Sequence, residues 1–203
     1  MTGLFQASIY FNHPILFYVA CSGALVYSIG QATNMLLPSL IAFHLNLSSI
    51  EYSKIETAWS VGALGVSVSL AILKTKMVRP LSFELIIISA MSLVLGFVPF
   101  ASRLPVLVAM HLLLGAAFAF VRIRMETRFL QECPVHLLGR FRANSMALTS
   151  LVGILVYFAP LINRKASIAV LYLSVASALL FVTVIVFAAS ASITSVGGRA
   201  IRE

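Results

Sequence analysis

Long stretches without charge are the feature that most limits how this chain can fold. The first 50 residues contain no Asp, Glu, Lys or Arg, and of all 203 residues only 10% are charged while 61% are hydrophobic. A soluble domain carries about 25% charged residues, because its surface must face water. So few charged side chains cannot cover a soluble surface. The sequence therefore predicts an integral membrane protein, and it excludes disordered, collagen-like and disulfide-stapled secreted chains.

Charged residues and prolines divide the hydrophobic sequence into segments that are long enough to cross a bilayer. A crossing helix needs about 20 mostly apolar residues. The opening segment is long and has no Lys or Arg before Lys54, which is unlike a cleaved signal peptide. The chain is therefore predicted to be a single all-α membrane domain over residues 1–203, with six spans at about 15–41, 56–73, 81–99, 105–121, 143–162 and 168–189. The first span is expected to end near Pro38.

The distribution of positive charge predicts the topology. Six spans place both termini on one side, together with the loops 74–80 and 122–142. That side holds ten Lys or Arg, whereas the other holds four, namely Lys54, Arg103, Arg164 and Lys165. Positive residues stay on the cytoplasmic side, so both termini are predicted to be cytoplasmic. Because the charges are scattered over short loops, the net charge of +8 favours anionic lipid headgroups rather than nucleic acid as the partner.

Small residues recur at a spacing of four along the predicted spans. In lipid, such spacing lets helix backbones approach closely and drives packing. The pattern predicts a tightly packed bundle and identifies no substrate. The pairs are Ala58 with Gly62, Gly65 with Ser69, Ser92 with Gly96, Gly115 with Ala119, and Ser174 with Ala178.

The first span carries polar residues on one face. Tyr27, Gln31, Asn34 and Pro38 follow one another at spacings of four, three and four, which places them on the same side of a helix. A side-chain amide deep in hydrocarbon needs a hydrogen-bond partner or a water-filled cavity. Two interpretations stay open. The amides hold neighbouring helices together, or they line a solute pathway near a proline that weakens the helix.

Other candidate residues lie at the ends of the spans or stand alone within them. Glu56 and Trp59 open the second span, where Trp is common as an interfacial anchor. His111 lies inside the fourth span and is a packing residue or a proton relay. Arg122 ends that span and is expected to extend toward lipid phosphate.

The residue inventory argues against an enzyme and against bound cofactors. The chain has no aspartate, no nucleophile elbow and no phosphate-binding lysine loop. Glu132, Cys133 and His136 resemble metal ligands, but Pro134 disfavours the regular helix that would bring them together. Neither a metal site nor a disulfide framework is predicted from the two cysteines.

Two segments resemble a known family of transporters. The stretch from Leu37-Pro38 through Glu51-Tyr52 to Trp59–Leu64 is similar to the start of the carboxyl-terminal half of a major facilitator superfamily transporter. The stretch from Arg128–Gln131 through Pro134 to Leu138-Gly139-Arg140 resembles the loop between the fourth and fifth helices of that half. The most similar branch is that of drug and siderophore exporters, including macrolide-efflux and enterobactin-exporter proteins. In the second motif, Pro134 would stop the interfacial segment, Gly139 would allow close packing and Arg140 would anchor the next helix.

The sequence departs from the family pattern at three places. Ser53 stands where the family tends to carry a glycine, and Val135 and His136 stand where it tends to carry an acid. The loop 74–80 keeps the positive charges of the family's loop signature but has neither Asp nor Gly.

The resemblance implies a fold of two inverted three-helix repeats, which form one of the two halves of a complete transporter. It implies a bacterial inner membrane, export of a small amphipathic solute driven by an ion gradient, and a second half or a second copy that covers the open polar face. The alternative is a transport-inactive membrane protein, either a truncated remnant or a module that binds another membrane protein.

Overall fold

The structure is a computed structural model that describes residues 14–73, 82–162 and 165–200, and its regular elements are helices. The main helices are α2 (Pro14–Ser39), α3 (Ser49–Leu73), α4 (Ser82–Phe97), α5 (Leu104–Glu132), α6 (Leu138–Ile162) and α7 (Ile168–Ala200). A π-helical turn, Leu40–His44, continues α2, and the 3-10 turns Val98–Phe100 and Val135–Leu137 follow α4 and precede α6. Six helices are long and apolar enough to cross a membrane, which confirms an all-α multi-pass membrane protein.

Helix α5 is much longer than predicted. The span was expected to end at residue 121, but α5 continues to Glu132. Its 29 residues extend over about 43 Å, whereas the hydrocarbon core is about 30 Å thick. The prediction treated Arg122 as the start of a loop. It was wrong because the next arginine, Arg124, is paired inside the bundle and does not need to leave it.

Helices α3 and α6 both begin earlier than predicted. Helix α3 begins at Ser49 and not at residue 56, because Ser48 and Glu51 form a cap: the backbone N–H of Ser48 donates to Glu51 Oε2 at 2.9 Å. Helix α6 begins at Leu138 and not at residue 143, directly after the 3-10 turn that follows Pro134.

The first span does not end near Pro38, although α2 itself ends at Ser39. Proline has no N–H to donate, so the regular helical ladder is interrupted at this position. The chain continues as the π-helical turn Leu40–His44, in which the N–H of Leu45 donates to the carbonyl of Leu40 at 3.0 Å. The proline therefore changes the type of helical turn and does not stop the span.

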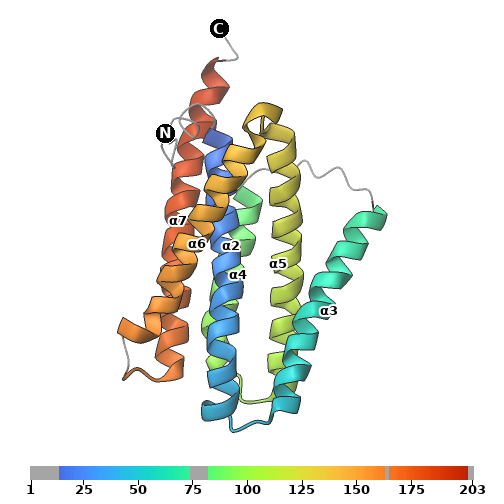
Figure 1. Cartoon of the computed structure of the whole chain (residues 1–203), viewed down its shortest axis with the longest axis vertical. Helices are drawn as coiled ribbons and strands as arrows, with labels where there is room; N and C mark the ends of the chain where they lie inside the picture. Colours follow the sequence, from blue (N-terminus) through green and yellow to red (C-terminus); the bar gives the residue numbers. More distant parts are fainter. Residues whose placement is uncertain (1–13, 74–81, 163–164, 201–203) are drawn as a thin grey trace.

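Helix α2 lies at the centre of the bundle, where α4, α5, α6 and α7 pack around it, and α3 packs on the outer side of α5 (Figure 1). The principal contacts pair α3 with α5, α4 with α7, and α6 with α2. The interior position of α2 suits its small hydroxyl residues, because Ser28 donates to the carbonyl of Ala24 at 2.7 Å and Thr33 to that of Ile29 at 2.9 Å. These groups are satisfied within their own helix and require no water.

The predicted pairs of small residues differ in what they contact. Gly62 on α3 lies against the backbone of Leu112, and Gly115 on α5 lies against the backbone of Trp59, so these two glycines join α3 to α5. Gly96 on α4 packs on Ala176 of α7, where an added Cβ would lie 3.3 Å from the Ala176 Cβ. Around Gly65, in contrast, the structure has open space. Ser174 and Ala178 line an apolar groove between α2, α6 and α7.

The beginning of α2, the end of α7 and the turn between α5 and α6 lie at the same end of the bundle (Figure 1). We call this end the α5–α6 end. The basic residues of the predicted cytoplasmic side that the structure describes with side chains are Arg122, Arg124, Arg128, Arg140 and Arg142, all on α5 or α6. The predictions for Lys74, Lys76, Arg79, Arg164 and Arg202 fall outside the described residues.

Candidate functional site

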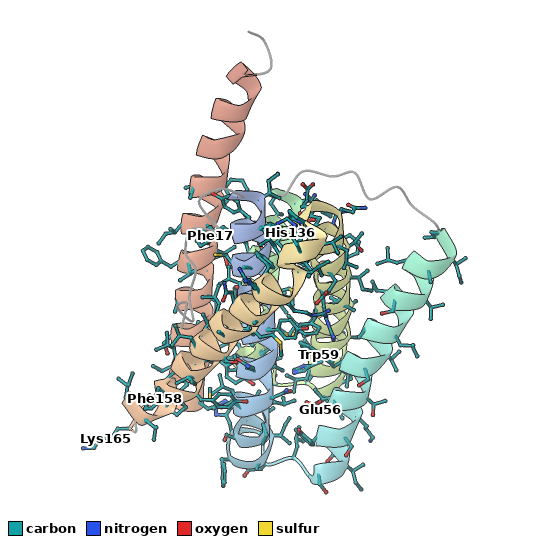
Figure 2. The ribbon with its side chains drawn as sticks, turned by 45° about the horizontal axis from the view of Figure 1, so that its top comes forward. Phe17, Glu56, Trp59, His136, Phe158 and Lys165 are labelled. Atoms are coloured by element: carbon teal, nitrogen blue, oxygen red, sulfur yellow. The ribbon has the colours of Figure 1, made fainter. Side chains whose placement is uncertain are left out.

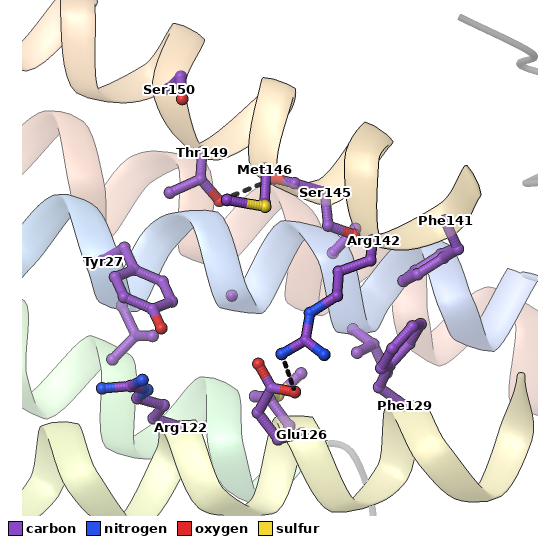
Figure 3. Close-up of a pocket in the computed structure, with 15 residues that line it drawn as sticks. Tyr27, Arg122, Glu126, Phe129, Phe141, Arg142, Ser145, Met146, Thr149 and Ser150 are labelled. Atoms are coloured by element: carbon purple, nitrogen blue, oxygen red, sulfur yellow. Dashed lines mark hydrogen bonds and ion pairs between the residues drawn. The ribbon is translucent and has the colours of Figure 1, made fainter. Parts of the chain in front are cut away.

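A cavity of about 330 Å³ lies between α2, α5 and α6, toward the α5–α6 end of the bundle. Figure 3 shows side chains from all three helices converging on it. Its polar lining comes mainly from six residues: Tyr27 on α2, Arg122 and Glu126 on α5, and Arg142, Ser145 and Thr149 on α6. We call this space the polar cavity. Of the residues predicted to lie along a solute pathway, only Tyr27 lines it.

Charged groups cross the polar cavity from α6 to α5. Arg142 Nη2 lies 3.4 Å from Glu126 Oε2, and the two side chains are 59% and 45% exposed. Arg122 lies over the ring of Tyr27, with 5.6 Å between its guanidinium carbon and the ring centroid. Arg122 is exposed and packs on an aromatic ring, and its expected extension toward lipid phosphate stays a prediction.

The opposite part of the polar cavity is apolar. The rings of Phe129 and Phe141 stack with centroids 4.9 Å apart and close one side of the cavity. Val19, Val26 and Met125 contribute further apolar surface. Polar and apolar groups therefore face one space, as in a site for an amphipathic molecule.

A row of three aromatic rings in contact connects the polar cavity to α3. The ring centroids of Tyr27 and Phe118 lie 5.6 Å apart, as do those of Trp59 and Phe118 (Trp59 is labelled in Figure 2). Gly30 leaves room for this arrangement, because an added Cβ would lie 3.3 Å from the Phe118 ring. Two predicted candidates, Tyr27 and Trp59, are thus connected through Phe118, which was not a predicted site residue.

The two amides of α2 have different surroundings. Gln31 packs against Gly153 on α6, and its Oε1 is buried without a hydrogen-bond partner among the described residues. Asn34 and Pro38 are exposed on the surface of the bundle. Gln31 therefore contacts α6 without the hydrogen bond that the interhelical interpretation predicts, whereas Asn34 contributes to an outward-facing surface.

Gly153 and Gln31 give a prediction about helix packing. A Cβ at residue 153 would collide with the Gln31 amide, which is the movable end of a flexible side chain. We expect Gly153→Ala to lower the free energy of unfolding by about 1 kcal/mol. In a Gln31→Ala background the same change should be neutral or stabilising, since nothing is left to displace and alanine favours a helix over glycine. Unfolding of the four proteins in mixed detergent micelles measures this coupling. Additive losses would show that the two residues do not interact.

Glu56 and His111 lie apart from the polar cavity. Glu56 is half-buried on α3 and has no ion-pair partner within the described ranges. His111 is completely buried on α5, with Nδ1 at 2.9 Å from the carbonyl oxygen of Leu107. Its Nε2 has no hydrogen-bond partner in the part of the chain that the structure describes. The structure thus places His111 in the packed interior.

The motif that carries the family resemblance forms the connection between α5 and α6. Pro134 begins the 3-10 turn, and its carbonyl accepts from the N–H of Leu137 at 2.9 Å. Gly139 lies in the first turn of α6, with no heavy atom of the described residues within 4 Å of an added Cβ. The role expected for Gly139 in close packing thus has no contact to support it among the described residues and stays a prediction. Arg140 is exposed, as a residue at the headgroup level would be.

The structure does not group the neighbouring Glu132, Cys133 and His136 as metal ligands. No group of three or more possible metal ligands occurs among the described residues. Burial raises the pKa of the Cys133 thiol, which favours the protonated form that binds metals poorly.

A buried ion cluster that was not predicted from the sequence lies near the α5–α6 end. Glu84 in the first turn of α4 is completely buried, and its Oε1 accepts from Arg124 Nε at 2.7 Å and from Arg128 Nε at 3.2 Å. Arg124 is 2% exposed, and its guanidinium carbon lies 5.7 Å from the ring centroids of both Phe83 and Phe120, which contact each other. The spacing of four between Arg124 and Arg128 was the available signal, because it places both on one face of a helix.

No protein-family model, no curated protein and no solved structure matches this chain. The case for a function therefore rests on the arrangement of the residues described above.

Proposed function

We propose that this chain is a half-length secondary transporter of the major facilitator type, in which the polar cavity lies on the pathway of a small amphipathic solute. The observation that carries the proposal is the position of the cavity. Charged and hydroxyl groups face an open space within a bundle whose outer surface is apolar. Ionisable groups inside membrane proteins face cavities or partners, and they commonly mark solute pathways.

The direction of the helices supports a proposal for the orientation of the termini. Because α2 begins and α7 ends at the end that carries the arginines of α5 and α6, we propose that both termini are cytoplasmic (Figure 1). We further propose that α2–α4 and α5–α7 are the two inverted repeats, that the solute is exported at the expense of an ion gradient, and that the membrane is a bacterial inner membrane.

A second six-helix unit, either another copy or a different half, completes the pathway in this proposal. The polar cavity is bounded by α2, α5 and α6, and the side chains of Arg142 and Glu126 remain about half exposed. Polar groups exposed to lipid are costly, so a companion that covers them is favoured. Asn34, also exposed on α2, would lie on the same covered surface.

Accessibility of single cysteines tests whether the polar cavity contains water. In a background without Cys21 and Cys133, we expect Thr149→Cys and Ser150→Cys to react with a membrane-impermeant maleimide, because both residues line the cavity. Ser150 lies about 18 Å along α6 from its first residue, well within the bilayer. Leu151→Cys is the matched control: Leu151 is exposed at the same depth but lies outside the cavity, so its thiol should stay unreactive.

Unreactive cysteines at both cavity positions would contradict the proposed pathway. Reactive cysteines without ion-driven solute flux in vesicles, with or without a second six-helix unit, would favour the transport-inactive alternative.

A further inference from the structure

The polar cavity has an excess of positive charge. Two guanidinium groups, those of Arg122 and Arg142, face it together with the single carboxylate of Glu126. Arg122 has no carboxylate partner within the described ranges, and it contacts the ring of Tyr27. The distance of 3.4 Å between Arg142 and Glu126 exceeds the usual 2.7–2.9 Å (approximately) of a charge-assisted hydrogen bond. Both arginines are therefore available to a further anionic group.

A hydroxyl beside these charges also lacks a partner. Ser145 Oγ is buried, lines the polar cavity and makes no hydrogen bond with the described residues. Figure 3 shows Ser145 on α6, one turn from Thr149 and close to Arg142. Buried hydroxyls are normally satisfied, so this group points to a polar ligand or to water in the cavity.

The apolar part of the cavity suits the body of an amphipathic molecule. Phe129, Phe141 and Val26 face the same space as the charged groups. A volume of about 330 Å³ is at the lower end of the range for small-molecule sites.

We propose that the polar cavity selects amphipathic anions, with the anionic group between Arg122 and Arg142 and the apolar body against Phe129 and Phe141. This inference rests on the proposed function and names the class of its solute. In the free site, Glu126 competes with the ligand for Arg142, so it opposes anion binding. The anionic group is a carboxylate, sulfonate or phosphate ester, and it belongs to a free solute or to a lipid headgroup.

Two fluorescent probes that differ only by an anionic group test this selection. Anilinonaphthalene sulfonate is the anionic probe, and phenylnaphthylamine is its uncharged analogue. Binding to the protein in phosphatidylcholine nanodiscs is followed by quenching of Trp59, the single tryptophan of the chain. We expect saturable binding of the sulfonate, weakened about tenfold or more in Arg122→Gln and in Arg142→Gln, because each loses a charge-assisted contact. Binding of the uncharged probe should not change.

Glu126→Gln should raise the affinity for the sulfonate, whereas the arginine variants lower it. A folding defect would not raise the affinity. Removing the competing carboxylate should strengthen sulfonate binding by about threefold. Arg122→Lys should retain part of the affinity. Arg103→Gln, at the opposite end of the bundle, removes an exposed positive charge as a control and should leave binding unchanged.

Equal binding of both probes, or a loss of sulfonate binding in Glu126→Gln, would overturn the proposal of anion selection. Reactive cysteines at residues 149 and 150 would still support the pathway in that case. Nanodiscs with phosphatidylglycerol distinguish the two sources of the anion. If the headgroup occupies the site, it competes with the sulfonate probe, and the ratio of sulfonate affinities between the wild type and Arg122→Gln falls toward one in these discs. If the site takes a free solute, this ratio is the same in both kinds of disc.

Discussion

Replacing Glu84 with glutamine is expected to destabilise the protein more than any other change of a single charge in the described structure. The carboxylate is completely buried and accepts hydrogen bonds from Arg124 and Arg128 through the same oxygen. Without it, Arg124 remains a buried cation that has lost the carboxylate of Glu84. Breaking a buried pair by removing one partner costs about 3–5 kcal/mol. We expect Glu84→Gln to lower the free energy of unfolding in mixed detergent micelles by this amount.

The pair of Glu126 and Arg142 provides the matched control, since it joins the same two residue types. Its side chains are about half exposed, so Glu126→Gln should change the free energy of unfolding by only about 0–1 kcal/mol. A double variant, Glu84→Met with Arg124→Met, should recover part of the loss, because neither charge is then buried. Equal effects of Glu84→Gln and Glu126→Gln would contradict the burial of the cluster.

Much of the fold could be predicted from single segments of the sequence. Hydrophobic runs decide where helices cross a bilayer, so the span predicted at 168–189 agrees with the apolar part of α7, Ile168–Ala189. The prediction was wrong where a charge ends a hydrophobic run without ending the helix. At Arg124 the helix continues, because a partner 40 positions away in sequence satisfies the charge.

The candidate site was less predictable, because it depends on contacts between distant segments. Helical spacing placed Tyr27, Gln31 and Asn34 on one face, but spacing does not show which neighbour covers each turn of that face. Tyr27 contacts Arg122 and Phe118. Gln31 packs against Gly153, and Asn34 is exposed. One face of α2 thus divides into three environments. The pairs of small residues were more informative, since a glycine on each of α3 and α5 forms the contact between these helices.

That contact gives the second large prediction. An added Cβ at Gly62 would clash with the carbonyl oxygen of Leu112, and one at Gly115 would clash with the carbonyl oxygen of Trp59. Both obstacles are backbone atoms, which a rotamer change cannot move, so the helices would have to separate. Overpacking typically costs about 1–3 kcal/mol, and we expect Gly62→Ala and Gly115→Ala to lie at the upper end of that range.

Gly65→Ala is the matched control on the same helix as Gly62. Open space surrounds Gly65, so its substitution adds no clash. Alanine favours a helix over glycine by about 0.8–1.0 kcal/mol in water, and we expect Gly65→Ala to be neutral or stabilising. Opposite signs for two identical substitutions three positions apart would establish that α3 packs on α5 through Gly62. A loss of stability in Gly65→Ala equal to that in Gly62→Ala would show instead that another face of α3 makes the contact. The ring contacts of Phe118 with Trp59 and Tyr27 would then also be in question, because they depend on the same packing of α3 on α5.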